Sequence, residues 1–227
     1  MYSLHIANKN YSSWSLRPWV LMRALDIPFD EVMHPFADTG NREAFRQFSP
    51  TARVPCLVDA AQTVWDSLAI AEYLAETHPQ VWPRDRAARA WARCASAEMH
   101  SGFNHLRNEC SMSCGQRIAL YNASPGLGQD LARIDELWSE GRDRFGGPFL
   151  ASREFTAVDA FFAPVVFRVQ SYQLALSSAA KDYLQLMLSL PAMAAWYESA
   201  LLETWREAAH EQEIANSGDI IADYRAG

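Results

Sequence analysis

The chain has 227 residues, of which 49% are hydrophobic and 12% aromatic, so it is long and apolar enough to bury a large core and is not disordered. With 20 Lys and Arg against 27 Asp and Glu, the net charge of −7 argues against nucleic-acid binding and against attachment to an anionic membrane. The first residues lack a secretory signal pattern, and no apolar run reaches the roughly 18 residues of a membrane span, so we expect a soluble, cytoplasmic protein.

Strand and helix signals alternate over the first 80 residues. Residues 3–7 alternate apolar and polar side chains, as a half-buried strand does, and residues 31–35 are expected to form a second strand. Between them a helix is expected to begin near residues 13–15, because Pro18 loses no hydrogen bond only in a first turn. The other elements expected here are a short helix at 41–48, a loop entering a strand at 51–59, its hairpin partner at 63–65 and a helix at 68–77.

This order of elements predicts an α+β layer, the thioredoxin-like arrangement, over residues 1–80. Beyond residues 81–84 only helical periodicity is found, so we place a domain boundary there and expect an all-helical domain over residues 85–227. Its expected helices are a long one at 85–108, one from about 125 to 146, one at 160–169 behind a capping box of Thr156 and Asp159, and two at 179–190 and 191–210. The tail from 212 to 227 is expected to be mostly surface.

The four cysteines are expected to be free thiols. Cys110 and Cys114 follow His100 and His105, but their spacing matches no standard zinc site, so we expect no metal.

Three serines at positions 12, 13 and 15 mark the start of the first helix. A helix N-terminus carries partial positive charge and unpaired N–H groups, so it stabilises anions, and nearby hydroxyls add directed hydrogen bonds. A plain helix cap is the alternative interpretation. In a thioredoxin-like layer this helix start, the loop at Val54-Pro55 and the helix start at Asp66-Ser67 lie at one edge, so one ligand can contact all three.

These residues resemble those of the cytosolic glutathione transferases. Residues 12–17, Ser-Ser-Trp-Ser-Leu-Arg, are similar to the zeta-class signature Ser-Ser-Cys-Ser-x-Arg, and residues 53–57 resemble the family's cis-proline loop. Residues 66–74, Asp-Ser-Leu-Ala-Ile-Ala-Glu-Tyr-Leu, match the motif (Glu/Gln/Asp)-Ser-x-Ala-Ile-x-x-Tyr-Leu, and residues 155–159 match the capping box of the second domain. The resemblance covers nearly the whole chain, in order and at family spacing.

The resemblance implies roles for residues of the first domain. Ser12 would donate a hydrogen bond to the sulfur of glutathione, with Ser13 as the second candidate, and Val54 would pair with the cysteinyl backbone. Asp66 and Ser67 would hold the γ-glutamyl end of the tripeptide.

The glycyl carboxylate would meet Arg53, or Arg42 from the second helix. The resemblance also implies a pocket for a hydrophobic electrophile between the first helix and the long helix from residue 85. The residues expected to line it are Tyr11, Trp14, Met99, His100, Phe103, Asn104 and Arg107. Core roles for Met99 and Phe103, and a surface or core-edge role for His100, are the alternatives.

The implied activity is conjugation of glutathione, as co-substrate, to a hydrophobic electrophile by a homodimeric enzyme. Two alternatives stay open. One is a glutathione-dependent isomerase acting on a cis-diene diketone acid of the maleylacetoacetate type, and the other is a non-catalytic protein-binding scaffold of the same fold.

Overall fold

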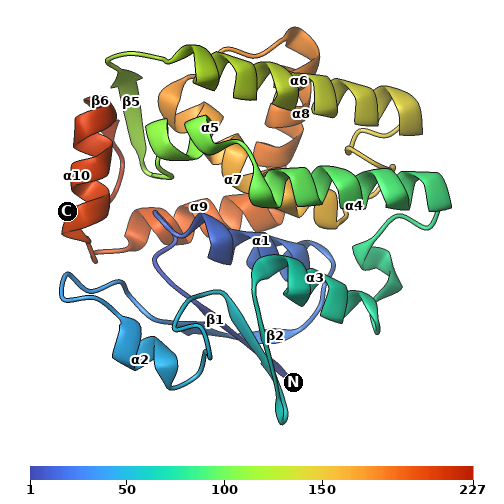
Figure 1. The fold of residues 1–227 in the computed structure, drawn as a ribbon, viewed down its shortest axis with the longest axis horizontal. Helices are drawn as coiled ribbons and strands as arrows, with labels where there is room; N and C mark the ends of the chain where they lie inside the picture. Colours follow the sequence, from blue (N-terminus) through green and yellow to red (C-terminus); the bar gives the residue numbers. More distant parts are fainter. Residues whose placement is uncertain (227) are drawn as a thin grey trace.

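The computed structural model describes residues 1–226. The first part of the chain forms a four-stranded sheet in the order β2-β1-β3-β4, in which β1 and β2 are parallel and the other pairs are antiparallel (Figure 1). Its elements are β1 (Tyr2–Ile6), α1 (Ser13–Ala24), β2 (Phe29–Met33), α2 (Arg42–Arg46), β3 (Cys56–Asp59), β4 (Gln62–Trp65) and α3 (Ser67–Ala75). The predicted mixed sheet with crossover helix and hairpin is confirmed.

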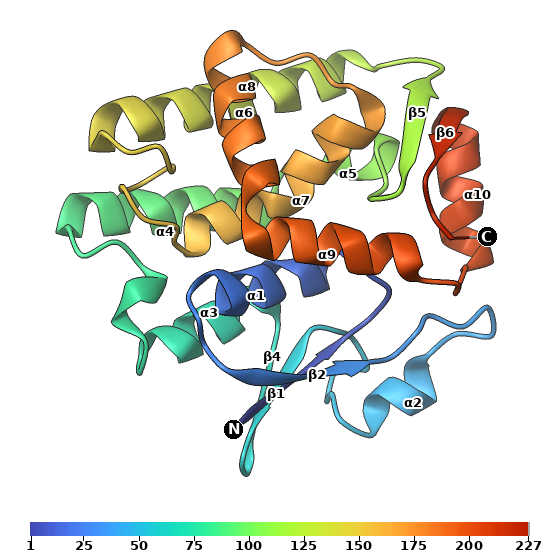
Figure 2. The same cartoon turned by 180° about the vertical axis from the view of Figure 1, so that it is seen from behind.

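Helices dominate the rest of the described chain, and they lie on one side of the sheet with α1 and α3 between (Figures 1 and 2). They are α4 (Arg86–Ser101), α5 (Asn104–Glu109), α6 (Pro125–Phe145), α7 (Ala157–Tyr172), α8 (Ser178–Ser189), α9 (Pro191–Leu202) and α10 (Ala208–Ser217), preceded by the 3₁₀ turn η1 (Pro79–Val81). Among the described residues, no helix is both long enough and apolar enough to cross a membrane.

The core runs continuously from the sheet into the helices. Leu4 and Ile6, at alternate positions of β1, are fully buried, as the alternating pattern predicts. α1 is buried on nearly every side because it packs against the sheet on one face and against α7 and α9 on the other. This burial holds the N-terminal end of α1 at the junction between the sheet and the helices.

Three expectations about helices are wrong. α1 begins at Ser13 as predicted, but Pro18 lies in its second turn, so the helix lacks the bond that residue 18 would donate to the carbonyl of Trp14. The long helix at 85–108 is two helices, because Phe103 adopts a left-handed conformation (φ +58°) between α4 and α5. The helix at 191–210 ends at Leu202 and a new one starts at Ala208.

The second part of the chain also contains strands that were not predicted. β5 (Gln116–Leu120) lies between the helices expected at 85–108 and 125–146, and it pairs antiparallel with β6 (Gly218–Asp223) in the tail that was expected to be mostly surface. Most residues after position 212 are exposed, as expected, yet α10 and β6 give this tail a fixed structure beside the start of α1 (Figure 1).

The predicted capping box at the start of α7 is confirmed. The buried carboxylate of Asp159 accepts hydrogen bonds from the backbone N–H groups of Leu150 (3.0 Å) and Thr156 (2.9 Å) and from the hydroxyl of Tyr183 (3.0 Å). Burial raises the pKa of Asp159 to about 6, although the hydrogen bonds from these donors act to lower it. The residue joins three segments of the helical part.

Candidate functional site

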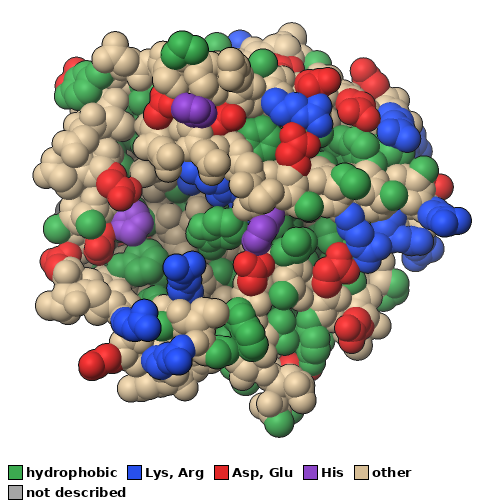
Figure 3. Space-filling model, in the orientation of Figure 1, with side chains coloured by type: hydrophobic (Ala, Val, Ile, Leu, Met, Phe, Trp, Pro, Cys, Tyr) green, Lys and Arg blue, Asp and Glu red, His purple; other side chains and the backbone are tan. Residues whose placement is uncertain are grey.

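A hollow lies between the sheet and the helices, with Lys or Arg and His side chains on its walls (Figure 3). It consists of a larger cavity of about 530 Å³ and a smaller one of about 360 Å³. The two cavities share four lining residues, Trp14, Thr51, Arg53 and Val54. One extended ligand can therefore occupy both, with Trp14 at the boundary between them.

The start of α1 forms part of the wall of the larger cavity. The Ser12 hydroxyl donates to Ser15 Oγ (2.7 Å), which also accepts from the backbone N–H of Ala7 (3.3 Å). The Ser13 hydroxyl lines the same cavity and forms no hydrogen bond to a described residue. The backbone N–H groups of Trp14 and Ser15 are likewise unpaired among the described residues, as expected for a first helical turn. The wall thus offers several donors to an anion.

The loop before β3 offers an unpaired stretch of backbone. The Val54–Pro55 peptide bond is cis, and the N–H and C=O of Val54 form no hydrogen bond to described residues. Val54 lines both cavities. An extended peptide can pair with such a backbone in the manner of an added strand.

The start of α3 forms the wall of the smaller cavity. Ser67 is buried, and its hydroxyl has no hydrogen-bond partner among residues 1–226, which costs free energy unless a ligand supplies one. Asp66 caps the helix by accepting from the N–H of Leu68 (2.8 Å), and it holds a backbone φ of +75° that is rare for a residue other than glycine. Its other carboxylate oxygen lies 3.5 Å from Nε2 of His100. Burial lowers the pKa of His100, so this contact joins a carboxylate to a largely neutral imidazole at pH 7.

Cationic side chains surround the hollow. Arg42, Arg53 and Arg168 line the larger cavity. Arg168 is only 4% exposed, and its Nε donates to the carbonyl of Cys110 (2.7 Å). Burial lowers the pKa of Arg168 to about 10, so the guanidinium remains charged at neutral pH. The site can therefore hold anionic groups despite the negative charge of the whole chain.

Arg17 lies beneath Trp14, with its guanidinium 4.2 Å from the centre of that ring and 5.0 Å from the ring of Phe161. It is 1% exposed, and none of its three guanidinium nitrogens has a hydrogen-bond partner among the described residues. Burial, together with the nearby charges of Arg107 and Arg168, lowers its pKa strongly. Burial of this cation therefore lowers the free energy of unfolding of the protein.

Most of the predicted site residues are brought together. Tyr11, Ser12, Ser13, Trp14, Arg42, Arg53, Val54, Asp66, Ser67 and His100 all line one or both cavities. Four residues predicted for the electrophile pocket do not appear on these walls. Met99 and Phe103 are buried in the core, Asn104 is exposed, and Arg107 packs its guanidinium on Trp14 (5.0 Å) and bonds the carbonyls of Met99 and Gly102. Asn104 and Arg107 lie on α5, beyond the break at Phe103, and so do not continue the face of α4 that carries His100.

Several further residues, none of them predicted from the sequence, also line the larger cavity. They are Phe36, Asn41, Phe45, Thr51, Ala52, Ser111, Met112, Arg168, His210 and Glu213. Arg168 carries a visible signal, since it is a charge inside an apolar run. The others come from loops, from the short helix α2 (Phe45) and from α10, where no pattern indicates which side chains face a cavity. No group of three or more His, Cys, Asp or Glu that could hold a metal occurs in residues 1–226.

The fold therefore has two parts. A thioredoxin-like sheet presents, at one edge, two helix starts and a loop whose backbone groups are unpaired among the described residues. The helices that follow complete the hollow. The chain belongs to the cytosolic glutathione transferase family. The family model for the glutathione S-transferase N-terminal domain matches residues 11–77, and the model for the C-terminal domain matches residues 119–199.

Curated relatives and solved structures agree with this membership. The chain is 28% identical over 177 residues to a protein named probable maleylacetoacetate isomerase from Caenorhabditis elegans, covering 73% of this chain and 77% of that protein. A glutathione S-transferase from Rhodospirillum rubrum superposes with a TM-score of 0.66 at 22% identity, covering 95% of this chain and 100% of the other. A glutathione transferase homologue from Burkholderia, solved with bound glutathione, gives 0.65 at 21% identity, covering 88% and 97%. At such identities these two structures show a shared fold.

Proposed function

We propose that the chain is a glutathione transferase that binds glutathione in the hollow and conjugates it to a hydrophobic electrophile. The observation that carries the proposal is the set of unpaired donors on one edge. Ser13 and Val54, whose hydroxyl and backbone N–H form no hydrogen bond to described residues, line the larger cavity, and Ser67, whose buried hydroxyl also has no partner among them, lines the smaller one. A tripeptide with two carboxylates and a thiol supplies partners for all of them.

The sulfur would lie at the start of α1. An unperturbed thiol with a pKa of about 8.5 is only a few per cent ionised at pH 7. A thiolate is a charged acceptor, so it competes well against Ser15 for the hydrogen of Ser12, and Ser15 can then donate to Ser12 in turn. We therefore keep Ser12 as the sulfur donor and Ser13, whose hydroxyl is already free, as the alternative.

The remaining parts of glutathione would extend from this point. The γ-glutamyl carboxylate fits the hydroxyl of Ser67 and the N-terminus of α3, while Asp66 attracts its ammonium group. Val54 would pair with the cysteinyl backbone, and Arg53 or Arg42 would meet the glycyl carboxylate. In this proposal residues 1–80 bind glutathione and residues 85–227 complete the electrophile pocket.

A second candidate is a glutathione-dependent isomerase. It is favoured by the name of the Caenorhabditis elegans relative and by that of a rat relative, maleylacetoacetate isomerase, at 26% identity over 172 residues. Against it, Trp14 stands where the zeta signature has cysteine, and this residue lines both cavities. We also propose a homodimer in the cytoplasm, with the exposed Trp65 of the edge strand β4 as one contact.

The test is titration calorimetry with glutathione, followed by turnover of 1-chloro-2,4-dinitrobenzene and of a cis-diene diketone acid. Binding with conjugation supports the transferase, and binding with cis–trans turnover alone supports the isomerase. If the chain binds no glutathione at millimolar concentration, the transferase and the isomerase proposals are both contradicted, and the non-catalytic protein-binding scaffold is the alternative that remains. Sedimentation velocity on the same sample tests the dimer.

A further inference from the structure

The larger cavity has a wall that comes from the C-terminal tail. His210, on α10, lines this cavity together with Ser12 and Ser13. It is the one histidine among the residues that line the larger cavity. A histidine is the side chain best suited to exchange protons near neutral pH, so its place in the same cavity as the proposed sulfur site is of interest.

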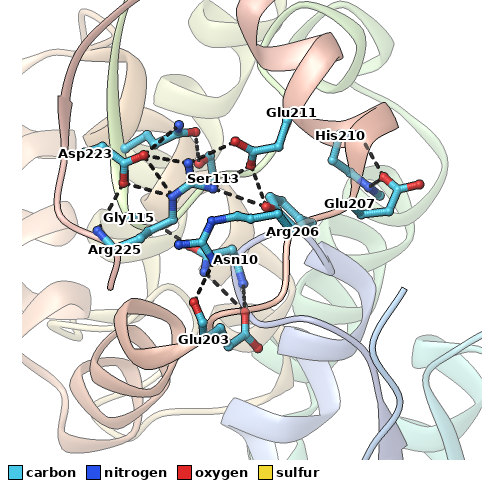
Figure 4. Close-up of polar contacts among 12 residues, drawn as sticks. Asn10, Ser113, Gly115, Glu203, Arg206, Glu207, His210, Glu211, Asp223 and Arg225 are labelled. Atoms are coloured by element: carbon cyan, nitrogen blue, oxygen red, sulfur yellow. Dashed lines mark hydrogen bonds and ion pairs between the residues drawn. The ribbon is translucent and has the colours of Figure 1, made fainter. Parts of the chain in front are cut away.

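The His210 ring is held in one orientation. Its Nδ1 lies 2.6 Å from Oε2 of Glu207, and the same oxygen accepts the backbone N–H of His210 (2.8 Å; Figure 4). The ring stacks between Tyr11 (4.9 Å, 16°) and Phe36 (5.3 Å, 19°). With the Nδ1 proton donated to Glu207, Nε2 is left as a bare proton acceptor, and it forms no hydrogen bond to a described residue.

The tail that carries this ring is fastened to the loop before α1 (Figure 4). Glu203 accepts from the backbone N–H groups of Lys9 (2.6 Å) and Asn10 (3.1 Å). Arg225 donates to Glu211 (2.5 Å) and to the hydroxyl of Tyr11 (3.1 Å). Because Tyr11 immediately precedes Ser12, these contacts fix the imidazole relative to the helix start that we propose for the sulfur.

The hydroxyl of Tyr11, whose ring stacks on His210, cannot exchange a proton near neutral pH. Tyr11 donates its proton to Glu211 (2.5 Å), and burial together with this bond raises the pKa of Tyr11 far above neutral. The guanidinium groups of the three arginines on the wall are donors only and have no site that accepts a proton. Glu213, the carboxylate of this wall, accepts the hydroxyl hydrogen of Ser111 (2.9 Å), so His210 is the one imidazole on this wall that can take up a proton and return it.

We propose that His210, oriented by Glu207, is a further catalytic residue, which takes the thiol proton of glutathione and returns it to carbon when glutathione is added across a double bond. This inference depends on the proposed function. Both reactions need the thiolate, but in displacement the thiol proton can pass to solvent, because the halide leaves with its electron pair and the product needs no proton. Addition to a conjugated alkene does need one, since the product contains one more C–H bond.

The step balances without a further reagent. Nε2 of His210 takes the thiol proton, and the sulfur electron pair forms a bond to the β-carbon of the alkene. The π electrons move to the carbonyl oxygen to give an enolate, and the imidazolium then protonates the α-carbon and is again neutral. The buried cation of Arg168 lies on the same cavity wall, where it favours a developing negative oxygen.

The experiment compares two reactions of each full-length variant. Addition is followed with trans-4-phenyl-3-buten-2-one and displacement with 1-chloro-2,4-dinitrobenzene. In His210→Gln, kcat/KM for addition is expected to fall about 100-fold, and that for displacement by less than about threefold. Glu207→Gln should lower addition about tenfold, and added imidazole should restore part of the addition rate of His210→Ala. His105→Gln, at an exposed histidine outside both cavities, should change neither reaction.

Equal losses in both reactions, or no loss, overturn the inference and leave His210 as a packing residue. Absence of addition in the wild-type chain overturns it as well. Calorimetry with glutathione separates this failure from that of the proposed function. If the wild-type chain and the variants bind glutathione alike, only the inference fails, whereas a wild-type chain without glutathione binding contradicts both.

Discussion

Replacement of Ser12 tests the assignment of the sulfur donor. A hydrogen bond to a charged acceptor is worth about 1.5–3 kcal/mol, and each pKa unit corresponds to about 1.36 kcal/mol. Ser12→Ala is therefore expected to raise the pKa of the bound thiol by about 1–2 units. The hydroxyls of Ser12 and Ser15 are 2.7 Å apart, so Ser15→Ala should raise it by a smaller amount through the loss of the second donor.

The assay is the thiolate absorbance of bound glutathione in the ultraviolet, titrated against pH at saturating ligand. Ser13→Ala is the matched control, because it removes a hydroxyl of the same cavity one residue away. The reasoning predicts a shift of less than about 0.3 unit for this variant, since the hydroxyl of Ser12 remains. A full shift in Ser13→Ala with none in Ser12→Ala would refute the assignment and place the sulfur on Ser13.

Three further outcomes follow from the buried polar groups. Ser67→Ala should weaken glutathione binding about tenfold in calorimetry and leave the pKa of the bound thiol unchanged, because the γ-glutamyl end lies away from the sulfur; a shifted pKa would contradict this. Arg17→Met should raise the free energy of unfolding in urea by about 1–2 kcal/mol, since it removes an unpartnered buried charge, and a loss of stability would contradict the cost we infer. The pKa of Asp159 is raised to about 6, so the folded state binds more protons than the unfolded state between about pH 4 and 6, and this group's contribution to stability falls as pH rises through that range. From pH 4 through pH 5 to pH 7, the urea concentration at the midpoint of unfolding should fall less in Asp159→Asn than in wild type. An equal fall in both proteins would count against the raised pKa of Asp159.

Much of the fold follows from local patterns in the sequence. The alternation in β1, the cap at Asp66 and the box at Thr156 and Asp159 each satisfy backbone groups within a few residues, so local sequence is enough to predict them. The expectations about Pro18 and about the helix at 85–108 failed for a different reason. Packing around α1 and the left-handed residue at 103 are decided by distant contacts, which override helix propensity.

The candidate site was predicted on one side only. Serines at a helix start and a capping Asp-Ser pair have a local signature, so Ser12 and Ser67 could be named in advance. The opposite wall is built by residues such as Phe36 and His210, which meet only because the tail returns across the loop before α1. No periodicity in the chain encodes that return, whereas Arg168 was detectable as a charge within an apolar helix.

A crystal structure of this chain with glutathione tests the central claim most directly. We predict the sulfur within about 3.5 Å of a hydroxyl at the start of α1, the cysteinyl backbone paired with Val54 and the γ-glutamyl carboxylate on Ser67. A tripeptide bound elsewhere, or bound with its sulfur turned away from α1, would contradict the account.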